Sequence, residues 1–402
     1  MKTGVRTVTA ILGAVALIAS CGRSTEQAQE TQPSTPPAVV TPVVASVVAP
    51  PIPVPATDGK DHLAYELQLI NTLTQDVTLT SMAVVAGDQT LMTLSGDNLK
   101  YWTRVIGNPT PTTKLGPGQT ALVWVDVALN RPTTIPGELT HQLGIAVTKP
   151  QPPLLPATMT ETVGQVSVQT RTPVVIAPPL DGPNWLNGDS CCDMTAHRMA
   201  MNPLNGELWA AERFAIDYIQ LGPGGRMFAG DKTKPESYPS FGADIYAVAE
   251  GPVVSVLDGL PEQVPGKSPT GLPLDQYAGN HVVQDIGDGN YALYAHMKTD
   301  SVKVKPGDEL TAGQVIGSLG NTGNSDGPHL HFHVMSTADP LASNGLPFVF
   351  SSFKLNSRMV SQEALDSLLN GQPAQLQPGF PIRDETDVSP LVLDVMTYAT
   401  GQ

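Results

Sequence analysis

Apolar and polar residues alternate with a period of two through the first half of the chain, from about residue 58 to residue 171. The clearest runs are Leu63, Tyr65, Leu67 and Leu69, then Ala121, Val123, Val125, Val127 and Leu129, and then Leu139, His141, Leu143, Ile145 and Val147. Turn sequences rich in Gly, Pro and Asn separate these runs. This pattern predicts half-buried strands, and their number and spacing predict an immunoglobulin-like β-sandwich over residues 58–172.

The second half of the chain is again mainly β, after a Pro-rich join predicted at residues 173–190. His281 to Asp285 and Tyr291 to His296 resemble a hairpin, because Gly287-Asp-Gly289 between them is a strong turn signal. Ser361 to Leu369 is predicted to be a helix, capped by Ser361. A second β-domain is therefore expected at 191–355, and residues 356–402 are expected to form a helix and a tail.

The N-terminus has the features of an export signal. Lys2 and Arg6 precede an apolar run that is too short for a permanent membrane span, so residues 1–20 are predicted to be a signal peptide. Ile18 to Cys21 resembles a bacterial lipobox, which implies lipidation at Cys21; an ordinary cleaved signal is the alternative. Residues 21–57 hold the lipidated Cys and a linker whose eight prolines between Gly22 and Ala56 favour an extended stalk.

The charge balance excludes one class of partner. The chain carries 22 Lys and Arg against 37 Asp and Glu, a formal net charge of −15 at pH 7. Nucleic-acid binding requires basic patches that neutralise phosphates, so no nucleic-acid partner is expected.

Two histidines, His329 and His331, stand in an H-x-H motif within an expected strand, Gly327 to Val334. Strand side chains alternate, so both imidazoles lie on one face. There they can share a metal ion, or one can bind metal while the other handles protons. A polar strand face with ordinary hydrogen bonds is the simpler alternative.

The neighbouring motifs strongly resemble those of the lysostaphin/LytM-type zinc peptidases. They are Tyr294-Ala-His296, Val304 to Asp308, Gly313 to Gly317 and Gly320 to Phe332, which occur together and in the family order. The resemblance implies a LytM-like β-domain and cleavage of the peptide cross-links of bacterial peptidoglycan.

The resemblance also implies roles for individual residues. Asp217 and His331 match two zinc ligands, while His296 and His329 match the histidines that orient the attacking water and support the transition state. Three N/O ligands leave zinc an open position, where it can lower the pKa of water to about 7 and polarise a carbonyl.

One position departs from the family pattern. Arg213 stands four residues before Asp217, where the family has its first histidine ligand, and a guanidinium offers no lone pair to a metal. The missing ligand can be replaced by His197, which lies close upstream, by His333, or by a thiolate of Cys191 or Cys192. The two cysteines can instead form a vicinal disulfide, pair with another chain or stay reduced.

Two further alternatives concern Arg213 itself. Arg213 can pair with Asp217 in a cleft without zinc, as in a wall-binding or regulatory domain that controls cell-wall amidases. It can also contact substrate carboxylates while His197 completes the metal site. The interpretation that we adopt is a zinc metalloendopeptidase acting on peptidoglycan. It is expected to be an exported lipoprotein, held on the outer side of the cytoplasmic membrane or in the periplasm.

Overall fold

The computed structural model describes residues 38–399, and the described residues from Val40 onward form one compact unit. The predicted signal peptide, the lipidation site Cys21 and the linker up to residue 37 lie outside the described residues. In the described part, no helix is both long enough and apolar enough to cross a membrane.

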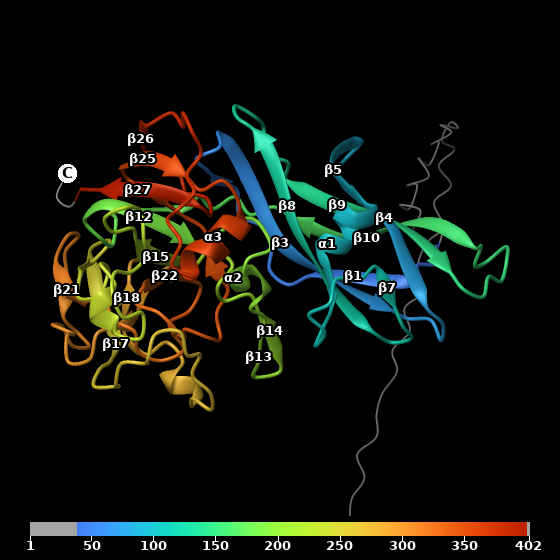
Figure 1. Cartoon of the computed structure of the whole chain (residues 1–402). Coiled ribbons are helices and arrows are strands. Elements are labelled where there is room, and N and C mark those ends of the chain that lie inside the picture. The colour runs from blue at the N-terminus through green and yellow to red at the C-terminus, as the bar shows by residue number, and fades with distance from the viewer. Residues whose placement is uncertain (1–37, 400–402) are drawn as a thin grey trace, which may run out of the picture. The chain divides into compact units, whose positions relative to one another are not determined.

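Two five-stranded antiparallel sheets form the N-terminal half of the described chain (Figure 1). The first has the order β1-β3-β8-β6, with β2 beside β3: β1 Val43–Val47, β2 Val54–Pro55, β3 Lys60–Asn71, β6 Thr103–Val105 and β8 Thr120–Asn130. The second has the order β10-β9-β4-β5, with β7 beside β4: β4 Val77–Ala86, β5 Gln89–Ser95, β7 Lys114–Leu115, β9 Glu138–Val147 and β10 Thr158–Ser167. A short helix, α1 Gly96–Tyr101, follows β5.

The two sheets enclose one hydrophobic cluster, to which the odd-numbered residues of β3 and β8 contribute. The three strands read from the two-residue period are confirmed as β3, β8 and β9. The linker prediction is wrong at its end: Val43–Val47 pairs with β3, and Val43 is fully buried. Val43, Ala45 and Val47 alternate like any edge strand, and Pro42 and Pro50 lie outside β1. Pro55 is paired, but it stands in the short strand β2 at the edge of the sheet.

An eleven-stranded sheet dominates the C-terminal half, in the order β20-β17-β18-β19-β22-β15-β12-β27-β25-β26 with β23 beside β22. Its strands are β12 Gly182–Gly188, β15 Ile216–Gln220, β17 Gly251–Leu257, β18 Asn280–Asp285, β19 Tyr291–Met297, β20 Glu309–Leu310, β22 Leu330–Met335, β23 Gly345–Leu346, β25 Phe353–Arg358, β26 Arg383–Glu385 and β27 Asp394–Tyr398. The predicted hairpin is confirmed as β18 and β19.

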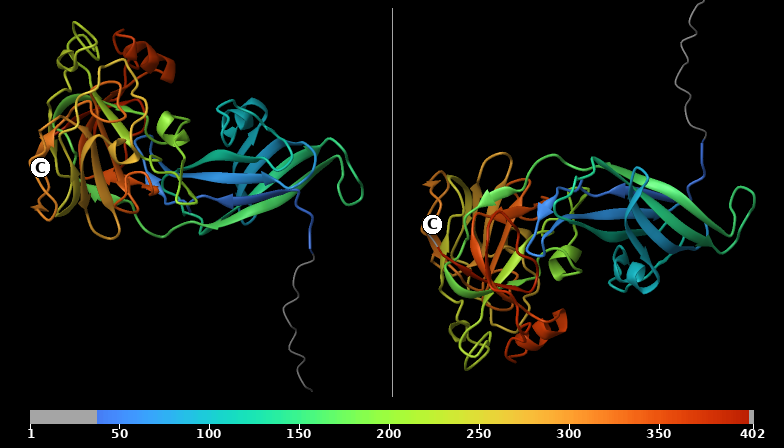
Figure 2. Two further views of the ribbon diagram at one scale, coloured as in Figure 1. Left: turned by 90° about the horizontal axis from the view of Figure 1, so that it is seen from below. Right: turned by 90° about the horizontal axis from the view of Figure 1, so that it is seen from above.

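Shorter elements complete this half (Figure 2). Three two-stranded pairs are β11 Val174–Ile176 with β24 Phe348–Phe350, β13 Asn202–Leu204 with β14 Glu207–Trp209, and β16 Asp244–Tyr246 with β21 Val315–Ser318. The helices are α2 Ala196–Met199, α3 Gln362–Leu369, and the single turns η1 Pro235–Ser237 and η2 Leu274–Gln276. Helix α3 confirms the predicted helix, and the Ser361 side chain caps it by accepting from the Ala364 N–H.

Two boundaries predicted from composition are wrong. Residues 173–190 are not a linker, because β12 lies inside the large sheet between β15 and β27. The expected tail also returns to the sheet, where β27 pairs with β12 and β25. Proline content suggested unstructured segments, whereas backbone pairing with distant strands decides the conformation.

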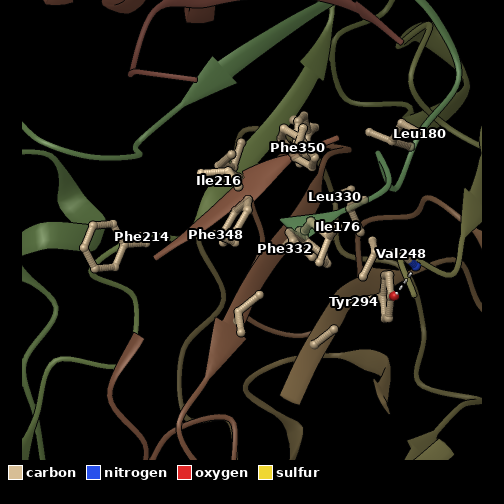
Figure 3. Close-up of a cluster of buried hydrophobic side chains, with 14 of the residues drawn as sticks. Ile176, Leu180, Phe214, Ile216, Val248, Tyr294, Leu330, Phe332, Phe348 and Phe350 are labelled. Carbon is tan, nitrogen blue, oxygen red and sulfur yellow. Dashed lines mark hydrogen bonds between the residues drawn. The ribbon is translucent and has the colours of Figure 1, made fainter. Parts of the chain in front are cut away.

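The core of the C-terminal half lies under the middle strands of the large sheet (Figure 3). Aromatic residues Phe332, Phe348 and Phe350 pack in it with edge-to-face contacts. The buried Tyr294 hydroxyl accepts from the Val248 N–H at 2.8 Å and donates to Gln284 at 2.8 Å, so its polar atom is satisfied. This rigid base supports the adjoining strand ends that carry the histidines. The mainly β fold is confirmed; the specific likeness of the N-terminal half to immunoglobulin domains stays a prediction.

Candidate metal centre

Asp217 and His331 face each other on neighbouring strands. Asp217 lies on β15 and His331 on β22, and the two are direct partners in the antiparallel register. Direct partners project their side chains on the same face of a sheet. The Nδ1 atom of His331 is 2.9 Å from Oδ1 of Asp217. Strand pairing alone therefore brings together two residues that are 114 positions apart in sequence.

His197 joins this pair from the short helix α2. Its Nε2 atom is 3.4 Å from Oδ2 of Asp217, and its ring centroid is 4.7 Å from that of His331. Its Nδ1 atom is 3.2 Å from the carbonyl oxygen of Ala215. An Nδ1–H that donates to this carbonyl leaves the Nε2 lone pair directed at Asp217. One ligand atom from each of His197, Asp217 and His331 lies within 4.8 Å of the others.

The three side chains suit a zinc ion in chemistry and in spacing. Two imidazoles and one carboxylate are a common zinc ligand set. Ligand atoms bound tetrahedrally at the usual zinc distances lie about 3.3 Å from one another, close to the separation of His197 and Asp217. His296, His329 and His331 also lie within 4.8 Å of one another, so His331 belongs to both groups.

Electrostatics links the charge of Asp217 to those of His197 and His329 in the metal-free protein. Burial works against a charged Asp217, but the nearby His197 and His329 hold the pKa of its carboxyl well below the usual range. Burial likewise lowers the pKa of His197, and the negative charge of Asp217 outweighs this and raises it to about 10. Without metal, His197 therefore carries a proton that a cation must displace.

His329 and His296 lie beside the three candidate ligands, His329 next to the start of β22 and His296 near the end of β19. His329, just before β22, has Nδ1 2.7 Å from the Gly327 carbonyl and Nε2 3.3 Å from Asp217. Burial lowers its pKa, but the charge of Asp217 gives a net rise. His296, on β19, has Nδ1 2.8 Å from the Thr322 carbonyl oxygen. Burial and the neighbouring His329 and His331 hold the pKa of His296 well below its usual value, so this imidazole is neutral.

A cleft of about 360 Å³ opens over these side chains. It is lined by His197, Asp217, His296, His329 and His331, and by three further carboxylates, Asp189, Glu212 and Asp326. The five predicted metal and catalytic residues, including the upstream His197, thus border one cavity. A molecule bound in the cleft would contact the candidate metal ligands. It would also lie beside two imidazoles whose pKa values are shifted in opposite directions, that of His296 down and that of His329 up.

Part of the chain matches a model of a known protein family. Residues 238–343, which include His296, His329 and His331, match the model described as peptidase family M23. The chain contains an M23 peptidase domain.

Sequence relatives of the M23 domain are endopeptidases by name. The peptidoglycan DD-endopeptidase ShyA of Vibrio cholerae is 33% identical over 104 residues, which cover 25% of this chain and 24% of ShyA. The glycyl-glycine endopeptidase ALE-1 of Staphylococcus capitis is 40% identical over 77 residues, 18% of this chain and 21% of ALE-1. The similarity thus spans about a quarter of these relatives or less.

A solved M23 structure also aligns with the chain. The catalytic domain of the prophage-encoded M23 protein EnpA from Enterococcus faecalis is 22% identical, with a TM-score of 0.25. The alignment covers 42% of this chain and 93% of that domain.

Arg213, just upstream of the matched M23 residues, takes neither of the two positions considered for it. Its guanidinium is buried and donates to the carboxylate of Glu66 on β3, with Nε 3.1 and 3.0 Å from the two oxygens. It does not pair with Asp217, and it is not among the residues that line the cleft. The fully buried Glu66 needs a counter-charge, which explains this pairing.

The other candidate ligands also have defined positions. Cys191 and Cys192 form a disulfide with each other, so neither offers a thiolate. His333 on β22 contacts His331 instead of Asp217, with its Nδ1 2.9 Å from Nε2 of His331. Its own Nε2 is buried without a hydrogen-bond partner. His333 therefore contacts the ring of His331 and also lines the cleft, a position that alternation along the strand could not reveal.

Asp189 is a further cleft residue that sequence reasoning missed. Burial raises the pKa of its carboxyl despite the nearby His197. It follows β12, which composition had assigned to a linker, so the strand signal needed to place it was hidden by neighbouring prolines.

Proposed function

We propose that this chain is a zinc-dependent endopeptidase that hydrolyses peptide cross-links of bacterial peptidoglycan. The observation that carries the proposal is the convergence of His197, Asp217 and His331, with His296 and His329 beside them in one cleft. The names of the relatives ShyA and ALE-1 support a peptide bond as the target, and the name of ShyA supports peptidoglycan as its source.

His197, Asp217 and His331 would hold the metal. Nε2 of His197, a carboxylate oxygen of Asp217 and Nδ1 of His331 are the three ligand atoms. A bound zinc ion supplies Lewis acidity, which activates water near neutral pH and polarises the carbonyl to be cleaved. His333 orients His331, because the contact between their rings occupies the nitrogen that does not face Asp217.

His296 and His329 would manage protons. His296 donates its Nδ1–H to Thr322, which leaves Nε2 as a neutral acceptor. His329 donates its Nδ1–H to Gly327, so its Nε2 is the atom that can give up or receive a proton. Their ring centroids are only 4.8 Å apart. One neutral imidazole beside one that holds its proton is a pair suited to general acid–base catalysis.

Zinc content and wall digestion of the purified full chain and its alanine variants test the proposal together. The wild type should bind one zinc and release peptides from purified sacculi. His197→Ala, Asp217→Ala and His331→Ala should lose both properties. His296→Ala and His329→Ala should keep zinc and lose hydrolysis.

Two results would overturn these assignments. A His197→Ala variant with full zinc content would remove His197 from the ligand set. A zinc-loaded wild type that binds sacculi without releasing peptides would exclude the endopeptidase activity.

We also propose that the protein is exported and is tethered to the membrane by a lipid on Cys21. The lipobox-like Ile18 to Cys21 and the preceding apolar run support this. Radiolabelled palmitate should enter the wild type but not Cys21→Ser, and Cys21→Ser should be recovered in the soluble exported fraction. Equal labelling of both proteins would refute lipidation at this site.

A further inference from the structure

One face of strands β3 and β8 in the N-terminal half is buried although it carries the carboxylate of Glu66. Glu66 and Trp124 are direct partners in the register of the two strands, so they share a face. The odd-numbered residues of both strands point into the sandwich core on the other face. In a free two-sheet sandwich the Glu66 face would meet water. Here Glu66 is 0% exposed and Trp124 is 4% exposed.

The chain that covers this face is the segment leading into α2. Trp124 donates its Nε1–H to the carbonyl oxygen of Arg198 at 2.6 Å. The Arg198 side chain is 1% exposed, donates to the carbonyl of Val125 at 3.3 Å, and lies 3.7 Å from Glu66. The same guanidinium also donates to the carbonyl of Cys192 at 3.2 Å. Arg198 therefore joins α2 to β8 through both its backbone and its side chain.

A second contact from the N-terminal half holds the start of the segment. The hydroxyl of Tyr101, the last residue of α1, donates to Asp193 at 2.8 Å. Asp193 stands four positions before His197 in the chain. The segment is thus held by the N-terminal half both before and after the histidine.

Helix α2 needs such support. It has only four residues, Ala196–Met199, and a single helical turn is unstable by itself because nucleation costs more than its few hydrogen bonds return. His197 directly precedes Arg198, so anchoring the Arg198 backbone sets where the His197 imidazole can reach.

We propose that the Glu66–Trp124 face of the N-terminal half positions His197 and so completes the metal site of the M23 domain. The proposal rests on the proposed role of His197 as a zinc ligand. Trp124 and Arg198 are positioning residues: they touch neither Asp217 nor His331 and act through the backbone of α2. The N-terminal half is thus part of the metal site in addition to any binding role of its own.

Trp124→Phe in the full chain tests this with the least disturbance, because it keeps an aromatic ring and removes the donor to Arg198. Zinc affinity is measured by competition with a chromophoric chelator. Loss of a group that hydrogen-bonds a metal ligand directly weakens metal binding about 10–100-fold. Trp124 acts one residue further away, so its loss should weaken zinc binding by about tenfold. The cobalt(II)-loaded protein gives a second readout, because its visible spectrum reports the ligand set. The Trp124→Phe spectrum should differ from that of the wild type.

Arg171→Gln is the matched control. Arg171 also links the two halves, by donating to Asn290 at 2.6 Å, but it contacts the β18–β19 turn and not the α2 segment. Its zinc affinity and cobalt spectrum should equal those of the wild type. Arg198→Lys should keep more affinity than Arg198→Met, because the ammonium can still donate to Val125 or pair with Glu66.

The outcomes separate this inference from the proposed function. If His197→Ala loses zinc and a folded Trp124→Phe binds it as the wild type does, positioning by the N-terminal half is refuted while the ligand role stands. If His197→Ala itself keeps wild-type affinity, the ligand role fails first. Should Trp124→Phe not fold, the Arg198→Lys and Arg198→Met pair decides, and equal affinities in the two variants refute the inference.

Discussion

Replacing Arg213 by Met should destabilise the protein through Glu66 and not through the cleft. The Arg213 guanidinium is 4% exposed and makes its hydrogen bonds to the fully buried Glu66 carboxylate. A methionine of similar length fills the space but leaves Glu66 with Arg198 alone, whose Nε is 3.7 Å away. The Glu66 carboxylate therefore keeps only Arg198 as a counter-charge, which interacts with it more weakly than Arg213 does because it lies further away.

The size of the effect follows from burial. Removing one partner of a buried ion pair costs about 3–5 kcal/mol, because the other charge stays buried without compensation. Arg198 still faces Glu66 in Arg213→Met, so the loss should be near 3 kcal/mol. Glu66→Gln leaves two buried guanidinium groups without a carboxylate, so its loss should be near 5 kcal/mol. In the double variant the two effects should be less than additive by at least about 1 kcal/mol, because the two side chains contact each other.

Urea unfolding followed by tryptophan fluorescence gives these free energies. Arg131→Met is a matched control, because Arg131 pairs with Asp61 at 3.7 Å with 45% of its side chain exposed, and such a pair contributes at most about 1 kcal/mol. If Arg213→Met is as stable as Arg131→Met but binds sacculi weakly, the buried pair is unimportant. Arg213 would then be a substrate residue after all.

Three other predictions concern separate parts of the chain. Because His197 must lose its proton to bind metal, zinc affinity should rise about tenfold per pH unit between pH 6 and pH 8 in chelator competition; no pH dependence would contradict this. Burial lowers the pKa of His62, but Asp126 and Asp58 outweigh this and raise it to about 9. Because this value exceeds the unfolded one, the stabilisation is complete below about pH 6.5 and is lost as pH rises through 9. Wild type should therefore lose about 3 kcal/mol over this range in urea unfolding, and His62→Gln should not. Ser361→Ala removes the cap of α3 and should cost about 1 kcal/mol, against no loss in Ser361→Asp.

Much of the site could be predicted because its signals are local. The H-x-H spacing puts His329 and His331 at one strand end, and the period of two identified strands β3, β8 and β9. Arg213 in place of a ligand is visible as soon as the resemblance to zinc peptidases is considered. The search for a substitute then leads to His197, and the structure brings that residue to 3.4 Å from Asp217.

Other features depend on which distant segments pack together. Alternation correctly assigned the odd residues of β3 to a core, but the same period of two puts Glu66 on the opposite face, where a free sandwich would meet water. Burial of Glu66 depends on the segment that covers it, here the one around Arg198, more than 130 residues away. The sequence analysis also missed the strands β1, β12 and β27, which pair with segments distant in the sequence. Prolines near a strand give little information about whether such a distant partner exists.

The sequence by itself thus determined the mainly β architecture, the capped helix and most of the candidate metal and proton-handling residues. These depend on side-chain periodicity and short motifs, which act within a few residues. Only the tertiary structure decided the partner of Arg213, the disulfide state of Cys191 and the placement of His197. Those outcomes depend on which buried charges and backbone groups meet across the fold, because each must find a partner once water is excluded.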